Sequence, residues 1–352
     1  MKLCTKLFLT ISVFFSNNTL IAADGAISHA PIGVMGDHLH KKNEFMFSLR
    51  FMQMKMKENL LNGVKVSDDQ ILNQPNIYSS MSGMPDNLSI VPNEMTMNML
   101  MTGVMYAPTD EITLMGMAMF TEKKMELSTY SPMMGRNFLG SFNTSASGLS
   151  NFSVVALIKL HENLFSRSHF HLGIDKSNGN SNVQGTILTP MNMSVSTTLP
   201  YGMQIGDNSL SLSTGLTLVA SWKNLIWGSQ YIYKSVIDKD EWAFGNKLSS
   251  STWVQKKLSY NVSISARASY VQSEKISGIN PSIAGPVQTA NPENYGGRVI
   301  NGAVGINLVT NFFDFSGKDR FAFELVFPLD QDKNGIQMKT SNSLIFGYQR
   351  SF

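Results

Sequence analysis

Methionines fall on alternate positions in three stretches of this sequence. Thirteen of the 23 methionines are involved: Met46, Met52, Met54 and Met56, then Met95, Met97, Met99, Met101 and Met105, then Met115, Met117, Met119 and Met125. Alternate residues of a strand lie on one face about 7 Å apart. Thioethers are soft ligands that suit Cu(I), so Met97, Met99, Met115 and Met117 are candidate copper ligands. The alternative is that these methionines only fill space in a narrow lumen or line it for an apolar solute, because methionine adapts to irregular spaces.

The six histidines form a second candidate group. Three of them, His29, His38 and His40, precede the first methionine stretch, and the others lie between residues 161 and 171. Imidazoles beside a carboxylate such as Asp37 bind Cu(II), Zn(II) or Ni(II). The candidate ligands are His38, His40, His161, His169 and His171. The alternative is that these histidines are only amphipathic residues at the rim of a membrane protein.

The segments that carry these residues alternate between apolar and polar positions, which is the period of a strand. Twelve such segments follow one another: 44–57, 94–107, 111–126, 149–161, 166–176, 208–220, 225–237, 246–257, 260–274, 298–312, 319–328 and 341–352. Typical globular strands have about five or six residues, whereas strands that cross a membrane need about ten. The segment lengths therefore favour membrane-spanning strands.

The connections between these segments alternate in length. Short turns such as 108–110 and 221–224 alternate with long polar loops at 58–93, 127–148, 177–207, 238–245, 275–297 and 329–340. Outer-membrane barrels have short periplasmic turns and long external loops. The last segment also places Leu344, Phe346, Tyr348 and Phe352 on one face. We predict an all-β fold, a transmembrane antiparallel up-and-down β-barrel of about twelve strands.

The alternation also predicts which side chains face the lumen. Phe45, Phe47, Leu49 and Phe51 have the parity of a lipid face, so the methionines between them belong to the lumen. The predicted lumen-lining residues are Met46, Arg50, Met52, Met54, Met97, Met99, Met101, Met115, Met117, Met119, Lys123 and Arg267.

Composition and the start of the sequence indicate the class of protein and the division of the chain. Only 15% of residues are charged, against about 25% in ordinary soluble domains, and a formal net charge of +3 gives no nucleic-acid footprint. Residues 1–23 have the basic start, apolar centre and small-residue end of a signal peptide. We expect residues 24–43 to form a periplasmic tail or a plug, and residues 44–352 the barrel. The expected location is the outer membrane of a Gram-negative bacterium, as a monomer in contact with lipid.

Several short motifs resemble a known group of proteins. The stretch from His29 to His38, the run Met95-Thr96-Met97-Asn98-Met99, residues 103–108, and Leu199-Pro200-Tyr201 with Met203-Gln204 are similar to transporters related to the meta-pathway phenol-degradation family. The resemblance covers most of the chain after residue 23, although Leu100 stands where a histidine is common. It implies an outer-membrane barrel that passes small solutes, and it assigns no site residues.

Three functions follow as hypotheses. The leading one is a channel or transporter for a small solute, and the second is a barrel that binds or transports copper. The third is an outer-membrane hydrolase, but the sequence has no Gly-x-Ser-x-Gly elbow and no His-Glu-x-x-His motif. We therefore expect no enzyme activity and no cofactor, apart from copper under the second hypothesis. The sequence identifies neither the solute nor an inner-membrane partner.

A closed barrel makes a prediction for the purified protein. In detergent it should show a β-rich circular dichroism spectrum and run faster on gels before boiling than after. A protein that fractionates as soluble and lacks both properties would contradict the barrel.

Overall fold

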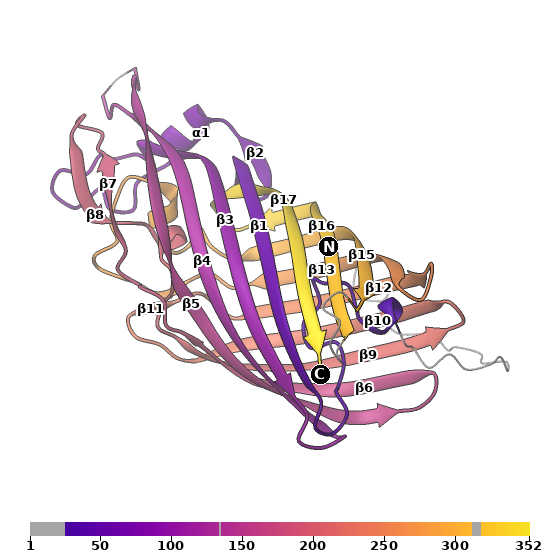
Figure 1. Ribbon diagram of the computed structural model, residues 1–352. Coiled ribbons are helices and arrows are strands. Elements are labelled where there is room, and N and C mark those ends of the chain that lie inside the picture. Colours follow the sequence, from indigo (N-terminus) through magenta and orange to yellow (C-terminus); the bar gives the residue numbers. More distant parts are fainter. Residues whose placement is uncertain (1–24, 134, 312–317) are drawn as a thin grey trace, which may run out of the picture.

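Twelve antiparallel strands close into a barrel in the computed structural model, which describes residues 25–133, 135–311 and 318–352 (Figure 1). The barrel strands are β1 (Phe45–Leu61), β3 (Ile90–Tyr106), β4 (Ile112–Tyr130), β5 (Phe138–Glu162), β6 (Ser166–Ser177), β9 (Leu210–Trp222), β10 (Leu225–Asp238), β12 (Lys247–Lys257), β13 (Val262–Ser273), β15 (Gly297–Thr310), β16 (Lys318–Lys333) and β17 (Ile336–Ser351). The proposed signal peptide lies outside the described residues.

Each barrel strand pairs with the next one along the chain, and β17 pairs with β1 to close the sheet. The closing pair runs from Met46 opposite Ser351 to Leu61 opposite Ile336, so it extends over the whole length of β1. The predicted transmembrane antiparallel barrel of twelve strands is confirmed.

The outer surface of the barrel carries a continuous apolar row. In the register of neighbouring strands, Leu100 lies opposite Phe51, Phe51 opposite Phe346, and Phe346 opposite Phe323. All four side chains are exposed. Exposed apolar rows of this kind face the hydrocarbon of a bilayer. The opposite parity therefore faces the lumen.

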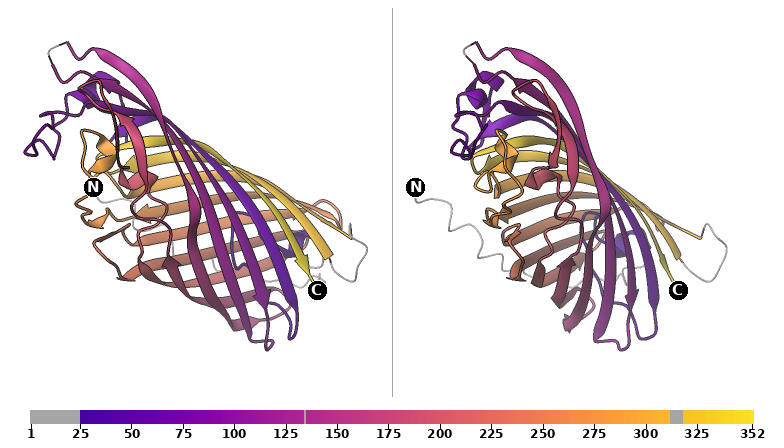
Figure 2. Two further views of the ribbon diagram at one scale, coloured as in Figure 1. Left: turned by 60° about the vertical axis from the view of Figure 1, so that its left-hand side comes forward. Right: turned by 90° about the vertical axis from the view of Figure 1, so that its left-hand side faces the viewer.

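Two of the predicted long loops are mostly strand. The loops expected at 127–148 and 329–340 shrink to residues 131–137 and 334–335, because β4, β5, β16 and β17 continue beyond their apolar segments (Figure 2). Backbone pairing continues in water without an apolar face, so the alternation that marks a membrane strand is weaker there. The sequence pattern locates the membrane-spanning part of each strand and underestimates its full length.

The remaining elements are short and lie mostly in the long connections. They are β2 (Val64–Val66), β7 (Gln184–Leu188), β8 (Ser194–Thr198), β11 (Trp242–Ala243), β14 (Ser277–Gly278), α1 (Asp68–Leu72) and the 3-10 turns η1 (Ala26–Ser28), η2 (Tyr201–Met203) and η3 (Gln288–Ala290). In the described part of the chain, no helix is both long and apolar enough to cross a membrane.

Candidate functional site

Residues 25–43, here called the N-terminal segment, lie inside the barrel at the end with the short turns. The amide of Asn43 donates to Ala107 at 2.8 Å, and the amide of Ala26 donates to Tyr260 at 3.0 Å. Both acceptors belong to short turns on different sides of the barrel. The segment therefore crosses the lumen between these two attachments.

Polar side chains of the wall bond the backbone of this segment. The contacts are Ser263 Oγ to Ala26 O, Arg167 to Ser28 O, Gln255 and Asn307 to His29 O, Arg320 to Ala30 O, Arg50 to Val34 O, Gln230 to Met35 O and His169 Nε2 with Gly36 O. These partners come from seven strands. A segment with little regular structure has backbone groups that need partners when buried, and the polar lumen supplies them.

A buried ion pair holds the turn of the segment. The Arg267 Nε donates to Glu324 Oε1 at 2.7 Å, and the Gly33 amide donates to Glu324 Oε2 at 2.7 Å. A Cβ atom on Gly33 would lie 2.3 Å from that carboxylate oxygen and 2.4 Å from an Arg267 nitrogen. A larger residue would have to displace the ends of both charged side chains, so the pair and the segment are matched to each other.

An apolar contact also attaches the N-terminal segment to the barrel wall. Trp253 of β12 is 1% exposed and packs with Ile27, Ala30 and Val34. Its ring covers Gly228 of β10, where an added Cβ would lie 2.1 Å from the ring. The absence of a side chain at position 228 therefore makes room for Trp253.

The methionines form rows across three neighbouring strands. The register places Met105 between Met46 and Met115, Met95 between Met56 and Met125, Met52 beside Met99, and Met54 beside Met97. Met46, Met101, Met105, Met115 and Met117 line a cavity of about 30 Å³ together with Met35 and Asp37 of the N-terminal segment. A cavity of this size holds about one or two waters.

The remaining predicted lumen residues occupy the same face farther along the barrel. Met97 lies opposite Lys123 and Met99 opposite Thr121, so neither belongs to the cavity beside the N-terminal segment. Met119 lies opposite Met101 in the same register. The ammonium group of Lys123 beside Met97 disfavours a cation there.

External loops close over the far end of the methionine rows. Lys123 Nζ donates to the carbonyls of Gly202 at 3.0 Å and Gln204 at 2.5 Å. Met95 and Met125 pack in a buried cluster with Tyr201 and other residues of η2, β11 and the loop before η3. The rows therefore run from the N-terminal segment to the external loops.

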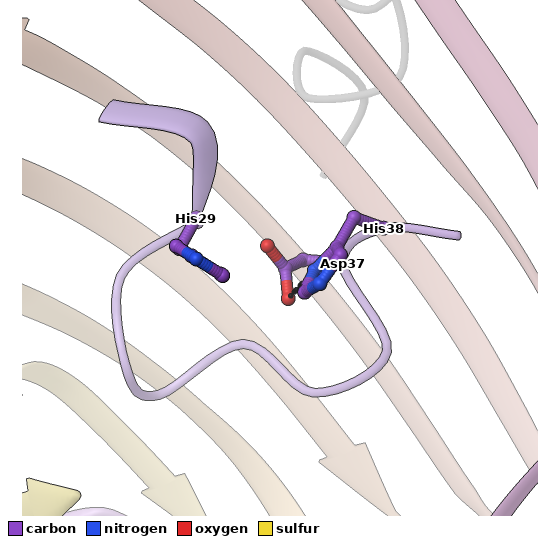
Figure 3. A group of neighbouring side chains, drawn as sticks. All are labelled: His29, Asp37 and His38. Atoms are coloured by element: carbon purple, nitrogen blue, oxygen red, sulfur yellow. Dashed lines mark ion pairs between the residues drawn. The ribbon is translucent and has the colours of Figure 1, made fainter. Parts of the chain in front are cut away.

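The structure brings two of the predicted histidine ligands together, because the ring centroids of His38 and His40 lie 4.8 Å apart. His161 is exposed at the end of β5, while His40 also pairs with Glu44 at 3.4 Å and His171 lies 3.3 Å from Ser213. A group of possible ligand atoms within 4.8 Å of one another belongs to His29, Asp37 and His38 (Figure 3). His29 is among the six histidines named from the sequence but not among the candidate ligands selected there.

One histidine pair bears on hydrolysis. His171 Nε2 lies 3.3 Å from Ser213 Oγ inside the lumen, but His171 Nδ1 has no hydrogen-bond partner among the described residues. In a Ser-His-Asp triad, an acid at the second nitrogen orients the imidazole. This pair lacks that orienting group.

Comparison with solved structures identifies the class of fold. No protein-family model and no curated protein matches the sequence. The COG4313 outer membrane channel from Pseudomonas putida F1 is similar at a TM-score of 0.56 and 14% identity, covering 90% of this chain and 98% of that one. A FadL homologue from Pseudomonas aeruginosa gives 0.42 and 11%, covering 88% and 90%. The TodX monoaromatic hydrocarbon channel, as a deletion mutant, gives 0.41 and 9%, covering 94% and 92%.

Of these three likenesses, only the first is strong enough to support an argument, and it concerns the fold. The chain has the barrel architecture of an outer-membrane channel. Membership of the meta-pathway phenol-degradation family stays a prediction, since no family model supports it.

The contact between Trp253 and the N-terminal segment can be tested by mutation. We expect Gly228→Ala to push the Trp253 ring into residues 27–34 and to cost about 1–3 kcal/mol of stability, as overpacking usually does. Urea unfolding in detergent measures the change. Gly116→Ala is the matched control, because its Cβ would meet only Val104 at an ordinary 3.6 Å. Equal stability of the two variants would contradict the role of Gly228.

Proposed function

We propose that this protein is a gated outer-membrane channel for a small solute, in which the N-terminal segment is the plug. The observation that carries the proposal is the set of wall side chains, from seven strands, that bond the backbone of the segment. The twelve strands close within one chain, which supports a monomeric channel.

The lumen has the arrangement that a gated passage needs. The N-terminal segment occupies the end with the short turns, the external loops cover the other end, and the methionine rows connect them. Flexible, polarisable side chains can rearrange around a passing solute at little cost. Opening requires the plug to leave its partners on the wall.

Most plug attachments are neutral hydrogen bonds, which suits a movable element. Each such bond contributes about 0.5–1.5 kcal/mol net, so losing a few is enough to change the population of the open state. The charged partners Arg267 and Glu324 neutralise each other at 2.7 Å. They remain paired when the Gly33 amide leaves, whereas Arg50, Arg167 and Arg320 each lose a carbonyl acceptor and need water in its place.

Weakening the plug should open the channel. We expect the double variant Gln230→Ala with Gln255→Ala to lose the bonds to Met35 and His29, at about 2 kcal/mol in total, and to raise the open fraction roughly tenfold or more. Ion conductance in planar bilayers measures this effect.

Gln272→Ala is the matched control, because Gln272 is exposed near the external end of β13. It should conduct as the wild type does. If neither the double variant nor a chain lacking residues 26–38 conducts more than the wild type, the proposal that the N-terminal segment is a plug is wrong. If no variant conducts at all, the channel function is wrong as well.

A second candidate function is passage of a soft metal ion such as Cu(I). The cavity beside the plug favours it, because five wall methionines and Met35 surround a space of about 30 Å³ with one carboxylate, Asp37. Thioethers in such number suit Cu(I) and discriminate against hard cations. An ion on this path would meet the plug directly.

The methionine cavity can be tested without unfolding the barrel. Replacing Met101, Met105, Met115 and Met117 by Leu should abolish binding of Ag(I), a soft analogue of Cu(I), while each swap costs under about 1.5 kcal/mol of stability. Isothermal titration calorimetry measures the binding. The control replaces the exposed Met81, Met133, Met191 and Met193 by Leu and should bind normally. Unchanged Ag(I) affinity in the cavity variant would leave the methionines as a packing surface.

A further inference from the structure

We propose that His29, Asp37 and His38 form a binding site for a divalent metal ion of borderline softness, such as Zn(II), which fixes the plug loop. All three residues belong to the N-terminal segment, and their ligand atoms lie within 4.8 Å of one another. Two imidazoles and one carboxylate are a common protein ligand set for zinc, with a fourth position left to a small ligand.

The loop between the ligands holds them face to face. Val34 donates its amide to the Pro31 carbonyl at 2.9 Å, and Gly36 adopts a positive φ of 60°, so the chain reverses between residues 30 and 37. The Ala30 amide donates to Asp37 Oδ2 at 2.7 Å and ties the two limbs together. Figure 3 shows His29 on one limb, facing Asp37 and His38 on the other.

Two of the ligand atoms already pair with each other, since His38 Nδ1 lies 3.0 Å from Asp37 Oδ1. His29 Nδ1 has no hydrogen-bond partner in the described ranges. Neighbouring ligand atoms around a tetrahedral ion lie roughly 3.4 Å apart, so Asp37 and His38 are already close to the required spacing. Rotation of the His29 ring has to close the remaining gap.

Burial and neighbouring charges act on two of the three side chains. Burial and the nearby Arg320 guanidinium lower the pKa of His29 well below its ordinary value, so the imidazole is neutral. Burial alone would raise the pKa of Asp37, but His38 and Arg320 hold it well below its usual range. A neutral imidazole and an ionised carboxylate are the forms that bind metals.

The surrounding cations set a limit on affinity. Arg320 and Arg167 donate to the Ala30 and Ser28 carbonyls on either side of His29, and Arg50 donates to Val34. These guanidinium groups position the ligands, and their charge also repels a divalent ion. The site is therefore an exchangeable one and not a permanent structural centre.

The position of the site connects it to the proposed passage. Asp37 lines the methionine cavity as well as the proposed metal site, so an ion held there lies next to the cavity. An ion that joins residues 29 and 38 also makes the loop between them more rigid. Binding of the ion does not require the channel function, so its test is independent of the conductance test.

The test titrates Zn(II) into the full-length barrel in detergent and into its variants. The wild type should bind one equivalent, and His29→Ala, His38→Ala and Asp37→Asn should each weaken binding by at least about tenfold, since even outer-shell changes cost that much. Asn at position 37 keeps an oxygen for the Ala30 amide. His161→Ala is the matched control, because that histidine is exposed and distant from the group, and it should bind as the wild type does.

A second readout reports on the loop itself. Zn(II) should slow hydrogen exchange of the amides between residues 29 and 38 in the wild type and leave exchange unchanged in His29→Ala. Heat-dependent gel mobility verifies that each variant is folded. The proposal is overturned if the wild type binds no Zn(II), if the His29→Ala, His38→Ala double variant binds with wild-type affinity, or if His161→Ala removes the binding.

Discussion

The main-chain hydrogen bonds of a membrane-spanning sheet have no water to satisfy them, and this constraint determines the rest of the structure. β1 meets the constraint by pairing with both β3 and β17, so no barrel strand leaves an edge in the lipid. Once the ring is closed, successive side chains alternate between lipid and lumen. The apolar exterior, the low content of charged residues and the rows of lumen side chains all follow from that alternation.

The same need for backbone partners explains the interior. The N-terminal segment has one short turn of regular structure, η1, and its residues 25–40 are buried or half-buried. Wall side chains such as Gln255, Arg320 and Gln230 bond carbonyls of this segment, and Glu324 accepts the Gly33 amide. The polar lumen is therefore matched to a segment of its own chain. Because the charges in the lumen are paired or bonded, they do not carry the cost of isolated buried ions.

Strand register decides which methionines become neighbours. Met46, Met105 and Met115 come from separate strands and form one row only because β1, β3 and β4 pair in this alignment. A slip of any one of these strands by one residue would turn the methionines of that strand to the lipid. The rows run from the N-terminal segment to the loops that pack on Met95 and Met125, and their side chains are flexible.

The sequence by itself determined the class of fold and the twelve strand segments of the barrel, because a bilayer imposes a period of two and a minimum length on every strand. It did not determine the extent of β5 or β17, since strand pairing in water needs no apolar face. It also did not identify His29 as the neighbour of Asp37 and His38, or separate His161 from them. The first depends on the chain reversal at residues 31–36, and the second on the β-bulge between Lys159 and His161 and on the exposed end of β5. Contacts of this kind arise from the path of the chain through three dimensions, which no local pattern of residues encodes.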